Sequence, residues 1–131
     1  MPCLDTDFIV ALLRRRTEAE GRLEQYASRG QSVSTTTITA CELYRGAYRS
    51  RDREKEVAKV SSILRSINLL TLTDESCMIF GRLSSHPELT GRPVGDLDLL
   101  IASIVLTANE TLVTKNVRHF SRVPNLRLEP W

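Results

Sequence analysis

The sequence has few of the residues that build disulfide frameworks or zinc sites. Its three cysteines include no Cys-x-x-Cys spacing, and its two histidines stand far apart, at positions 86 and 119. Structural zinc requires clustered thiolates and imidazoles, and an odd number of separated cysteines favours reduced thiols. We therefore expect Cys3, Cys41 and Cys77 to be buried free thiols in a cytoplasmic protein without zinc.

Long apolar runs and a strong charge imbalance are also absent. No apolar stretch is long enough to span a membrane, and Met1-Pro2 leads directly into a foldable segment, so we expect neither a membrane anchor nor a signal peptide. The 18 basic and 16 acidic residues leave a formal net charge of +2. A charge this small indicates nucleic-acid binding only if the basic residues cluster.

The sequence does contain enough apolar residues for one hydrophobic core. It has 131 residues, of which 41% are hydrophobic and 26% are charged, as is typical of a globular domain. No internal repeat, linker or low-complexity tract interrupts it. We predict a single domain over residues 1–131.

Short apolar or β-branched stretches alternate with helical patterns along the chain. The predicted strands are 3–5, 33–36, 69–72, 111–114 and 126–128. Strands separated by helices indicate a mostly parallel sheet with helices on both faces. The predicted fold class is therefore α/β, a three-layer α/β/α sandwich around a mostly parallel sheet of four to five strands.

One predicted helix, from Leu97 to Leu106, is apolar on almost every face. Its exceptions are Asp98 and Ser103. Such a helix is usually buried, and a buried carboxylate needs a partner such as a metal ion or a positively charged side chain. Asp96 is the natural N-cap, which leaves Asp98 without a capping role.

Four polar residues are expected near the carboxyl ends of the predicted strands. Asp5 ends the first strand and Asn116 follows the fourth, while Glu42 and Asp98 lie in the first turns of helices that begin near the same edge. Ligands of parallel sheets bind beyond this edge. The sequence therefore predicts that these four side chains converge.

Converging carboxylates at neutral pH require either protons or a cation. Oxygen ligands without thiols favour Mg²⁺ or Mn²⁺ over zinc or copper. Such an ion suits phosphoryl chemistry, because it polarises a phosphate oxygen and lowers the pKa of a bound water. We expect Asp5 and Asp98 to bind the ion and Glu42 to bind it directly or through water. Asn116 and Thr114 would then position the attacking water.

These residues also have purely structural interpretations. Asp5 can cap the first helix, although Thr6 or Asp7 can do so as well. Glu42 fits a capping box in which Thr39 is the N-cap. The asparagine after the fourth strand is typical of a turn. Taken one at a time, these residues are weak evidence for a metal site. The functional interpretation is favoured because all of them are expected at the same edge of the sheet.

Four segments, in chain order, carry a resemblance to a known family. They are LDTD, TITACELYRGA, GRPVGDLDLLIAS and TLVTKNVRHFSRVPNLRLEPW. Together they resemble the PIN-domain ribonucleases, specifically the VapC-type toxins of prokaryotic toxin–antitoxin pairs. The resemblance covers essentially the whole chain, and the last two segments are its most specific part.

The resemblance implies that Asp5, Glu42 and Asp98 surround a metal ion. Many PIN proteins carry a fourth acid in the stretch that contains Thr114 and Asn116 here. An asparagine can orient a ligand or a water molecule, but it supplies no charge for a second ion.

Two further acids differ from the family pattern and are interpreted as supporting residues. Asp96 lies where members often have a neutral residue, and could partly compensate for the missing fourth acid. Asp7 lies where members more often have asparagine or serine.

The resemblance also implies an activity and its partners. The activity is that of a Mg²⁺- or Mn²⁺-dependent endoribonuclease acting on structured RNA such as tRNA or rRNA. The partners are a second copy of the chain and a cognate VapB-type antitoxin whose tail covers the active site. Candidate phosphate contacts are Arg14, Arg15, Arg16, Arg45, Arg49, Arg51 and Arg53. Each arginine is equally compatible with a solvated helix face.

Two other classes of function remain open. Asp5-x-Asp7 after a strand also resembles the motif of haloacid dehalogenase-type phosphoaspartate enzymes, for which Asp96-x-Asp98 is the only candidate second acidic pair. Trapping of a phosphate mimic on Asp5 would identify that class. A non-catalytic receiver-like or RNA-binding module would use the acids only to bind a regulatory ion. RNA that is bound but not cut would identify it.

Overall fold

The computed structural model describes residues 1–131, apart from the side chain of Glu88. Five short strands form one sheet in the order β3-β2-β1-β4-β5, and all neighbouring pairs are parallel. The strands are β1 (Cys3–Leu4), β2 (Ser34–Thr36), β3 (Asn68–Leu70), β4 (Thr111–Val113) and β5 (Arg127–Glu129). The predicted parallel sheet is therefore confirmed.

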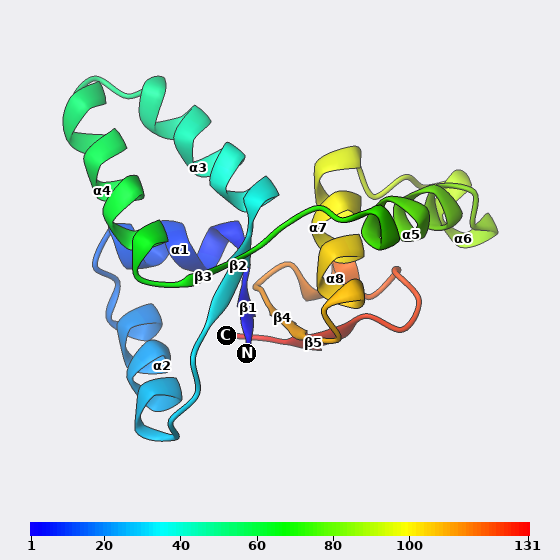
Figure 1. The fold of residues 1–131 in the computed structure, drawn as a ribbon, viewed down its shortest axis with the longest axis horizontal. Helices are drawn as coiled ribbons and strands as arrows, with labels where there is room; N and C mark the ends of the chain where they lie inside the picture. Colours follow the sequence, from blue (N-terminus) through cyan, green and yellow to red (C-terminus); the bar gives the residue numbers. More distant parts are fainter.

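Helices cover both faces of this sheet. They are α1 (Thr6–Leu13), α2 (Thr17–Ser28), α3 (Thr37–Tyr48), α4 (Arg53–Arg65), α5 (Asp74–Ser84), α6 (Pro87–Thr90), α7 (Asp96–Thr107) and α8 (Val117–Phe120). Helices α1–α4 lie on one side of the strands and α5–α7 on the other (Figure 1). Among the residues described, no helix combines the length and hydropathy needed to cross a bilayer.

Two apolar cores lie on opposite faces of the sheet. Successive residues of a strand point to opposite faces, so Leu4 and Val113 enter the core formed with α1–α4, whereas Cys3 and Leu112 enter the core on the other face. All four side chains are fully buried. The central strands β1 and β4 are therefore apolar on both faces, which is the pattern expected for a buried parallel sheet.

Helix α7 is the most buried helix predicted from the sequence, and the structure confirms its position. It packs against α5 and α3 and against strands β2 and β4. Its one polar residue at depth, Ser103, is fully buried and donates its hydroxyl to the carbonyl oxygen of Leu99 at 2.7 Å. This local hydrogen bond satisfies the hydroxyl inside the core.

The strand order places a topological switch point between β1 and β4. From β1 the chain passes to β2 and then β3 on one side, and the α5–α7 connection returns it to β4 on the other side of β1. Leu4 pairs with Val113, and the backbone N–H of Asp5 donates to the Val113 carbonyl at 3.0 Å. The residues that follow β1 and β4 thus lie side by side where ligands of open α/β sheets bind.

The N-caps of two helices next to this edge can be compared with the prediction. Asp5 is the N-cap of α1, and its Oδ1 accepts a hydrogen bond from the backbone N–H of Thr6 at 2.8 Å, so neither Thr6 nor Asp7 is the cap. The N-cap of α7 is Gly95 at φ +99°, and Asp96 is the first helical residue. The predicted Asp96 cap is wrong because the chain enters α7 through a backbone conformation that favours glycine.

The N-cap of helix α3 lies three residues before the predicted cap at Thr39. Its N-cap is Thr36, whose Oγ1 accepts a hydrogen bond from the backbone N–H of Thr39 at 3.0 Å. The predicted capping box of Thr39 and Glu42 is therefore wrong, and Glu42 lies in the second helical turn rather than the first. Several neighbouring threonines are locally equivalent caps, and the end of β2 at Thr36 decides among them.

The cysteines are all free thiols, but only one is buried. Cys3 lies in the core, and burial raises its pKa to about 12. Cys41 and Cys77 are exposed on α3 and α5. The prediction of three buried thiols is therefore wrong for the two helical cysteines, because both lie on solvent-facing helix surfaces.

Candidate active site

Asp5 is the most buried acid at the carboxyl edge of the sheet. It is only 7% exposed, and its Oδ2 accepts a hydrogen bond from the Thr114 hydroxyl at 2.7 Å. Burial raises the pKa of Asp5 from 3.8 to about 6, although hydrogen bonds from Thr114 and Thr6 favour the charged form. The charges of Asp7 and Asp98 raise this pKa further. Asp5 and Asp98 are thus close enough to interact electrostatically.

Glu42 reaches the same region from α3. Its Oε1 accepts a hydrogen bond from the Thr6 hydroxyl at 2.8 Å, and that hydroxyl lies 3.3 Å from the hydroxyl of Thr39. Thr6 therefore links the first turn of α1 to α3, with its N–H on Asp5 and its hydroxyl on Glu42. From the sequence, Thr6 is interpreted only as a possible cap. Its place between the two acids of LDTD is the signal that it adjoins the site.

Asp98 enters from the first turn of α7 and is bonded to a histidine. Its Oδ2 lies 3.0 Å from Nε2 of His119, and the two side chains are about one-third and one-quarter exposed. The ring of His119 also packs edge-on against Phe120, with centroids 5.4 Å apart. In the sequence, His119 stands far from the other histidine, and no partner is predicted for it. Its position three residues after Asn116, on the helix that follows β4, is the signal that could have placed it here.

The loop after β4 contributes a hydroxyl rather than an amide side chain to the group around Asp5. Thr114 is fully buried and donates to Asp5, while its Oγ1 accepts from the backbone N–H of Asn116 at 3.0 Å. Asn116 is exposed at the N-cap of α8, and its side chain makes no capping hydrogen bond. Thr114 is therefore the member of this stretch that contacts an acid directly.

The two supporting acids occupy different surroundings. Asp7 accepts hydrogen bonds from the backbone N–H of Lys115 at 3.0 Å and from Trp131 Nε1 at 3.2 Å, and it lies 3.3 Å from the Thr114 hydroxyl. Asp96 is exposed at the first position of α7. Asp7 thus belongs to the hydrogen-bonded group around Asp5, whereas Asp96 faces solvent.

Comparison with known proteins shows the family to which this chain belongs. Residues 3–126 match the family model for the PIN domain. The chain belongs to the PIN-domain family. Ribonuclease VapC2 of Rickettsia felis is 29% identical over 128 residues, which cover 98% of this chain and 96% of that protein. Ribonuclease VapC2 of Haemophilus influenzae is 30% identical over 129 residues, with the same coverage of both.

Solved structures of VapBC complexes have the same fold as this PIN domain. A chain in the crystal structure of VapBC2 from Rickettsia felis bound to a promoter DNA fragment superposes with a TM-score of 0.90 and 30% identity, covering 98% of this chain and 97% of that one. A chain of DNA-bound VapBC from Salmonella typhimurium gives 0.89 and 26%, covering 100% and 99%. The resemblance to VapC-type PIN proteins is confirmed.

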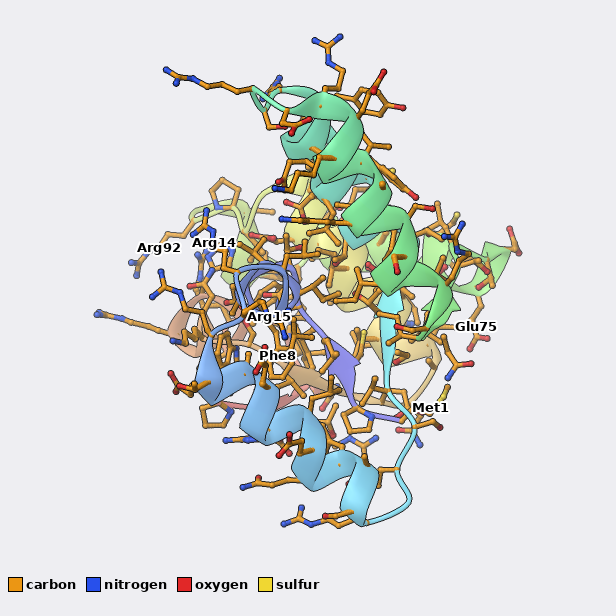
Figure 2. All side chains as sticks on the ribbon, turned by 90° about the vertical axis from the view of Figure 1, so that its left-hand side faces the viewer. Met1, Phe8, Arg14, Arg15, Glu75 and Arg92 are labelled. Carbon is orange, nitrogen blue, oxygen red and sulfur yellow. The ribbon has the colours of Figure 1, made fainter. Side chains whose placement is uncertain are left out.

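A groove of about 720 Å³ in this PIN domain runs between α1, α3 and α4. Thr6 and Glu42 line it, so it adjoins the acids. Its remaining lining is mostly apolar and basic, with one further acid, and includes Val10, Leu43, Ala47, Val60, Arg14, Arg15, Lys59 and Glu56. Figure 2 faces this side of the molecule and shows Arg14 and Arg15 at the end of α1. Of the other predicted RNA contacts, Arg16, Arg45, Arg49, Arg51 and Arg53 are exposed.

The acids of this PIN domain match a hard divalent cation in chemistry, but they do not form a closed cage. Asp5, Glu42 and Asp98 supply only oxygen donors, as Mg²⁺ and Mn²⁺ prefer. Within the part of the chain described, no three His, Cys, Asp or Glu side chains lie close enough to hold one ion. Glu42 is bonded to Thr6 and Asp98 to His119. Each of these bonds uses one carboxylate oxygen, which leaves the second oxygen of Glu42 and of Asp98 as a possible ligand.

Proposed function

We propose that this PIN domain is a Mg²⁺- or Mn²⁺-dependent endoribonuclease that hydrolyses phosphodiester bonds of structured RNA, such as tRNA or rRNA. Relatives over nearly the whole chain are named ribonuclease VapC. The observation that carries the proposal is the burial of the Asp5 carboxylate, which is only 7% exposed and has a pKa raised to about 6. This carboxylate lies beside further acids at the switch point of the sheet. A divalent cation would offset the unfavourable burial of this charge.

The roles of the acids follow from their positions. Asp5 and Asp98 would bind the cation, and Glu42 would bind it directly or through water. When bound, the ion would polarise the scissile phosphate and activate a water molecule. Thr114 holds one oxygen of Asp5, which leaves the orientation of this carboxylate little freedom. His119 holds Asp98 when no ion is present.

Basic residues near the groove would bind the RNA backbone. Arg14, Arg15 and Lys59 line the groove next to Glu42, and Arg45 and Arg49 are exposed on α3. Contacts of this kind are electrostatic, and RNA affinity should therefore fall as the salt concentration rises. Asn116 is exposed beside Thr114, where its amide would orient the attacking water.

We also assign the chain to the toxin side of a type II toxin–antitoxin pair with a VapB-type antitoxin. The superposed chains come from VapBC complexes. The groove is lined by apolar side chains together with Arg14, Arg15, Lys59 and the acids Glu42 and Glu56. An antitoxin segment lying in it would cover Glu42 and exclude RNA.

A homodimer acting in the cytoplasm, where tRNA and rRNA are found, completes the proposal. Leu69 and Leu72 are each 42% exposed on and after the edge strand β3, and Met78 on the adjacent α5 is 70% exposed. A second copy of the chain would cover these apolar side chains.

The test is to map RNA ends after brief expression and to repeat the cleavage with purified protein in Mn²⁺ or in EDTA. We expect wild type to create new ends only with the metal, and Asp98→Asn to create none. Asp74→Asn is the matched control, because Asp74 is an exposed acid in the first turn of α5. Equal cleavage by folded Asp98→Asn would refute the site. RNA bound in Mn²⁺ but left uncut would indicate a non-catalytic module.

A further inference from the structure

The parallel register of β4 and β5 brings the end of the chain to the active-site edge. Val113 pairs with Glu129, and the backbone N–H of Thr114 donates to the Glu129 carbonyl at 3.0 Å. The residues after Glu129 therefore run beside the residues after Val113. This pairing places Trp131 next to Lys115.

Trp131 contacts both α1 and the loop after β4. Its ring packs edge-on against Phe8 with centroids 4.8 Å apart, and Lys115 Nζ lies 4.2 Å from the indole centroid. Its Nε1–H donates to Asp7 Oδ1 at 3.2 Å. Since Nε1–H is the only hydrogen-bonding group of an indole, this group is committed to Asp7.

Asp7 connects the indole to the loop that carries Thr114. While Oδ1 accepts from Trp131, Oδ2 accepts from the backbone N–H of Lys115 at 3.0 Å and lies 3.3 Å from the Thr114 hydroxyl. The same hydroxyl lies only 2.7 Å from Asp5 Oδ2. A hydroxyl has one proton to donate, so Thr114 donates to Asp5, and Asp7 is the competing acceptor.

We propose that Trp131 is a positioning residue of the active site, which holds Asp7 on Lys115 and thereby keeps the Thr114 hydroxyl on Asp5. The proposal rests on the ribonuclease function proposed above. Without the indole N–H, Asp7 is free to turn, and it can then accept the hydrogen bond that the Thr114 hydroxyl otherwise donates to Asp5. Asp5 then loses the hydrogen bond that fixes its Oδ2.

Trp131→Phe separates this role from simple packing, because it keeps a smaller aromatic ring next to Phe8 and removes the Nε1–H. The end of β5 stays anchored in this variant, since Arg22 Nη1 lies 2.9 Å from Glu129 Oε2 and the Tyr26 hydroxyl also donates to that oxygen. Tyr26→Phe is the matched control. It too removes one ring-borne donor to a carboxylate, but at a carboxylate outside the Asp7 group.

The experiment combines RNA cleavage kinetics in Mn²⁺ with amide hydrogen exchange in metal-free protein. We expect Trp131→Phe to lower kcat roughly 10- to 100-fold, as loss of a supporting contact to a metal site does, with KM unchanged. The Lys115 amide should exchange faster in the same variant. Tyr26→Phe should change neither. Asp7→Asn combined with Trp131→Phe should lose no more activity than Trp131→Phe alone, because an amide oxygen competes less well than a carboxylate for the Thr114 hydroxyl.

Other results would overturn the proposal. These are wild-type kcat in Trp131→Phe, unchanged exchange at Lys115, a loss of activity that only tracks the folded fraction, or additive losses in the double variant. A wild type that cuts no RNA would instead refute the proposed function alone. The exchange measurement needs neither metal nor RNA, and it would still decide whether Trp131 holds Lys115 through Asp7.

Discussion

Replacement of Asp5 by asparagine should stabilise the metal-free protein while it abolishes cleavage. The amide can reproduce both hydrogen bonds of the carboxylate: its oxygen can accept from the Thr6 N–H, and its Nδ2 can donate to the Thr114 hydroxyl. Asparagine is also as good an N-cap as aspartate. The substitution therefore removes a buried charge and little else.

The magnitude and its pH dependence follow from the pKa of Asp5, which burial raises from 3.8 to about 6. At about 1.4 kcal/mol per pKa unit, a shift of about two units corresponds to about 3 kcal/mol. Well below pH 3.8 the carboxyl is neutral in both folded and unfolded protein, so the charge costs nothing. Between pH 4 and pH 6 the folded state binds more protons than the unfolded state, and wild type loses stability as the pH rises. Above pH 6 the full cost remains.

Urea unfolding of wild type and Asp5→Asn, measured from pH 4 to pH 8 in EDTA, tests this reasoning. We expect similar free energies of unfolding at pH 4 and an advantage of about 3 kcal/mol for Asp5→Asn at pH 8. A variant that is no more stable than wild type at pH 8, or an advantage that is the same at both pH values, would refute it. With Mn²⁺ at about 100 times its Kd, wild type should gain about 2.7 kcal/mol, and Asp5→Asn should gain little.

Three further predictions test the fold around the site. Iodoacetamide should label Cys41 and Cys77 in the native protein but label Cys3 only in urea, because Cys3 is buried and its pKa is raised to about 12. Three adducts on the native protein in a mass spectrum would contradict this. Gly95→Ala should lower the free energy of unfolding by about 1–3 kcal/mol, because the native φ of Gly95 is +99°. Unchanged urea unfolding would be inconsistent with a positive φ at this position. Leu112→Ala should cost about 2–5 kcal/mol in the same assay, as the side chain is fully buried, and a negligible loss would argue against its place in the core.

Much of the fold follows from local patterns in the sequence. Helical segments alternate with β-branched and apolar stretches, which predicts a parallel sheet between two layers of helices. The apolar run from Leu97 to Leu106 predicts the buried helix α7, with Asp98 in its first turn. The carboxyl edge of a parallel sheet is a property of the architecture, so the approach of Asp5 and Asp98 to it could be predicted as well.

The prediction was least accurate where local signals are degenerate. In TTTIT several threonines are equally good caps, so the sequence favours Thr39 where Thr36 is the cap, and it predicts a capping role for Glu42 that the structure does not show. At α7 the acid Asp96 is a good cap by type, but the positive φ of Gly95 is set by how the loop meets the helix. Such choices depend on where the strand or loop ends in space.

The amino-acid sequence by itself determined the elements, their polarity and the acids at their ends, because these depend on residues a few positions apart. The order β3-β2-β1-β4-β5 and its registers decided which distant side chains meet. Thr6 on Glu42, His119 on Asp98 and Trp131 on Asp7 are contacts of this second kind. No local periodicity encodes them, since each joins residues that approach only when the strands have paired and the two cores have closed on either side of the sheet.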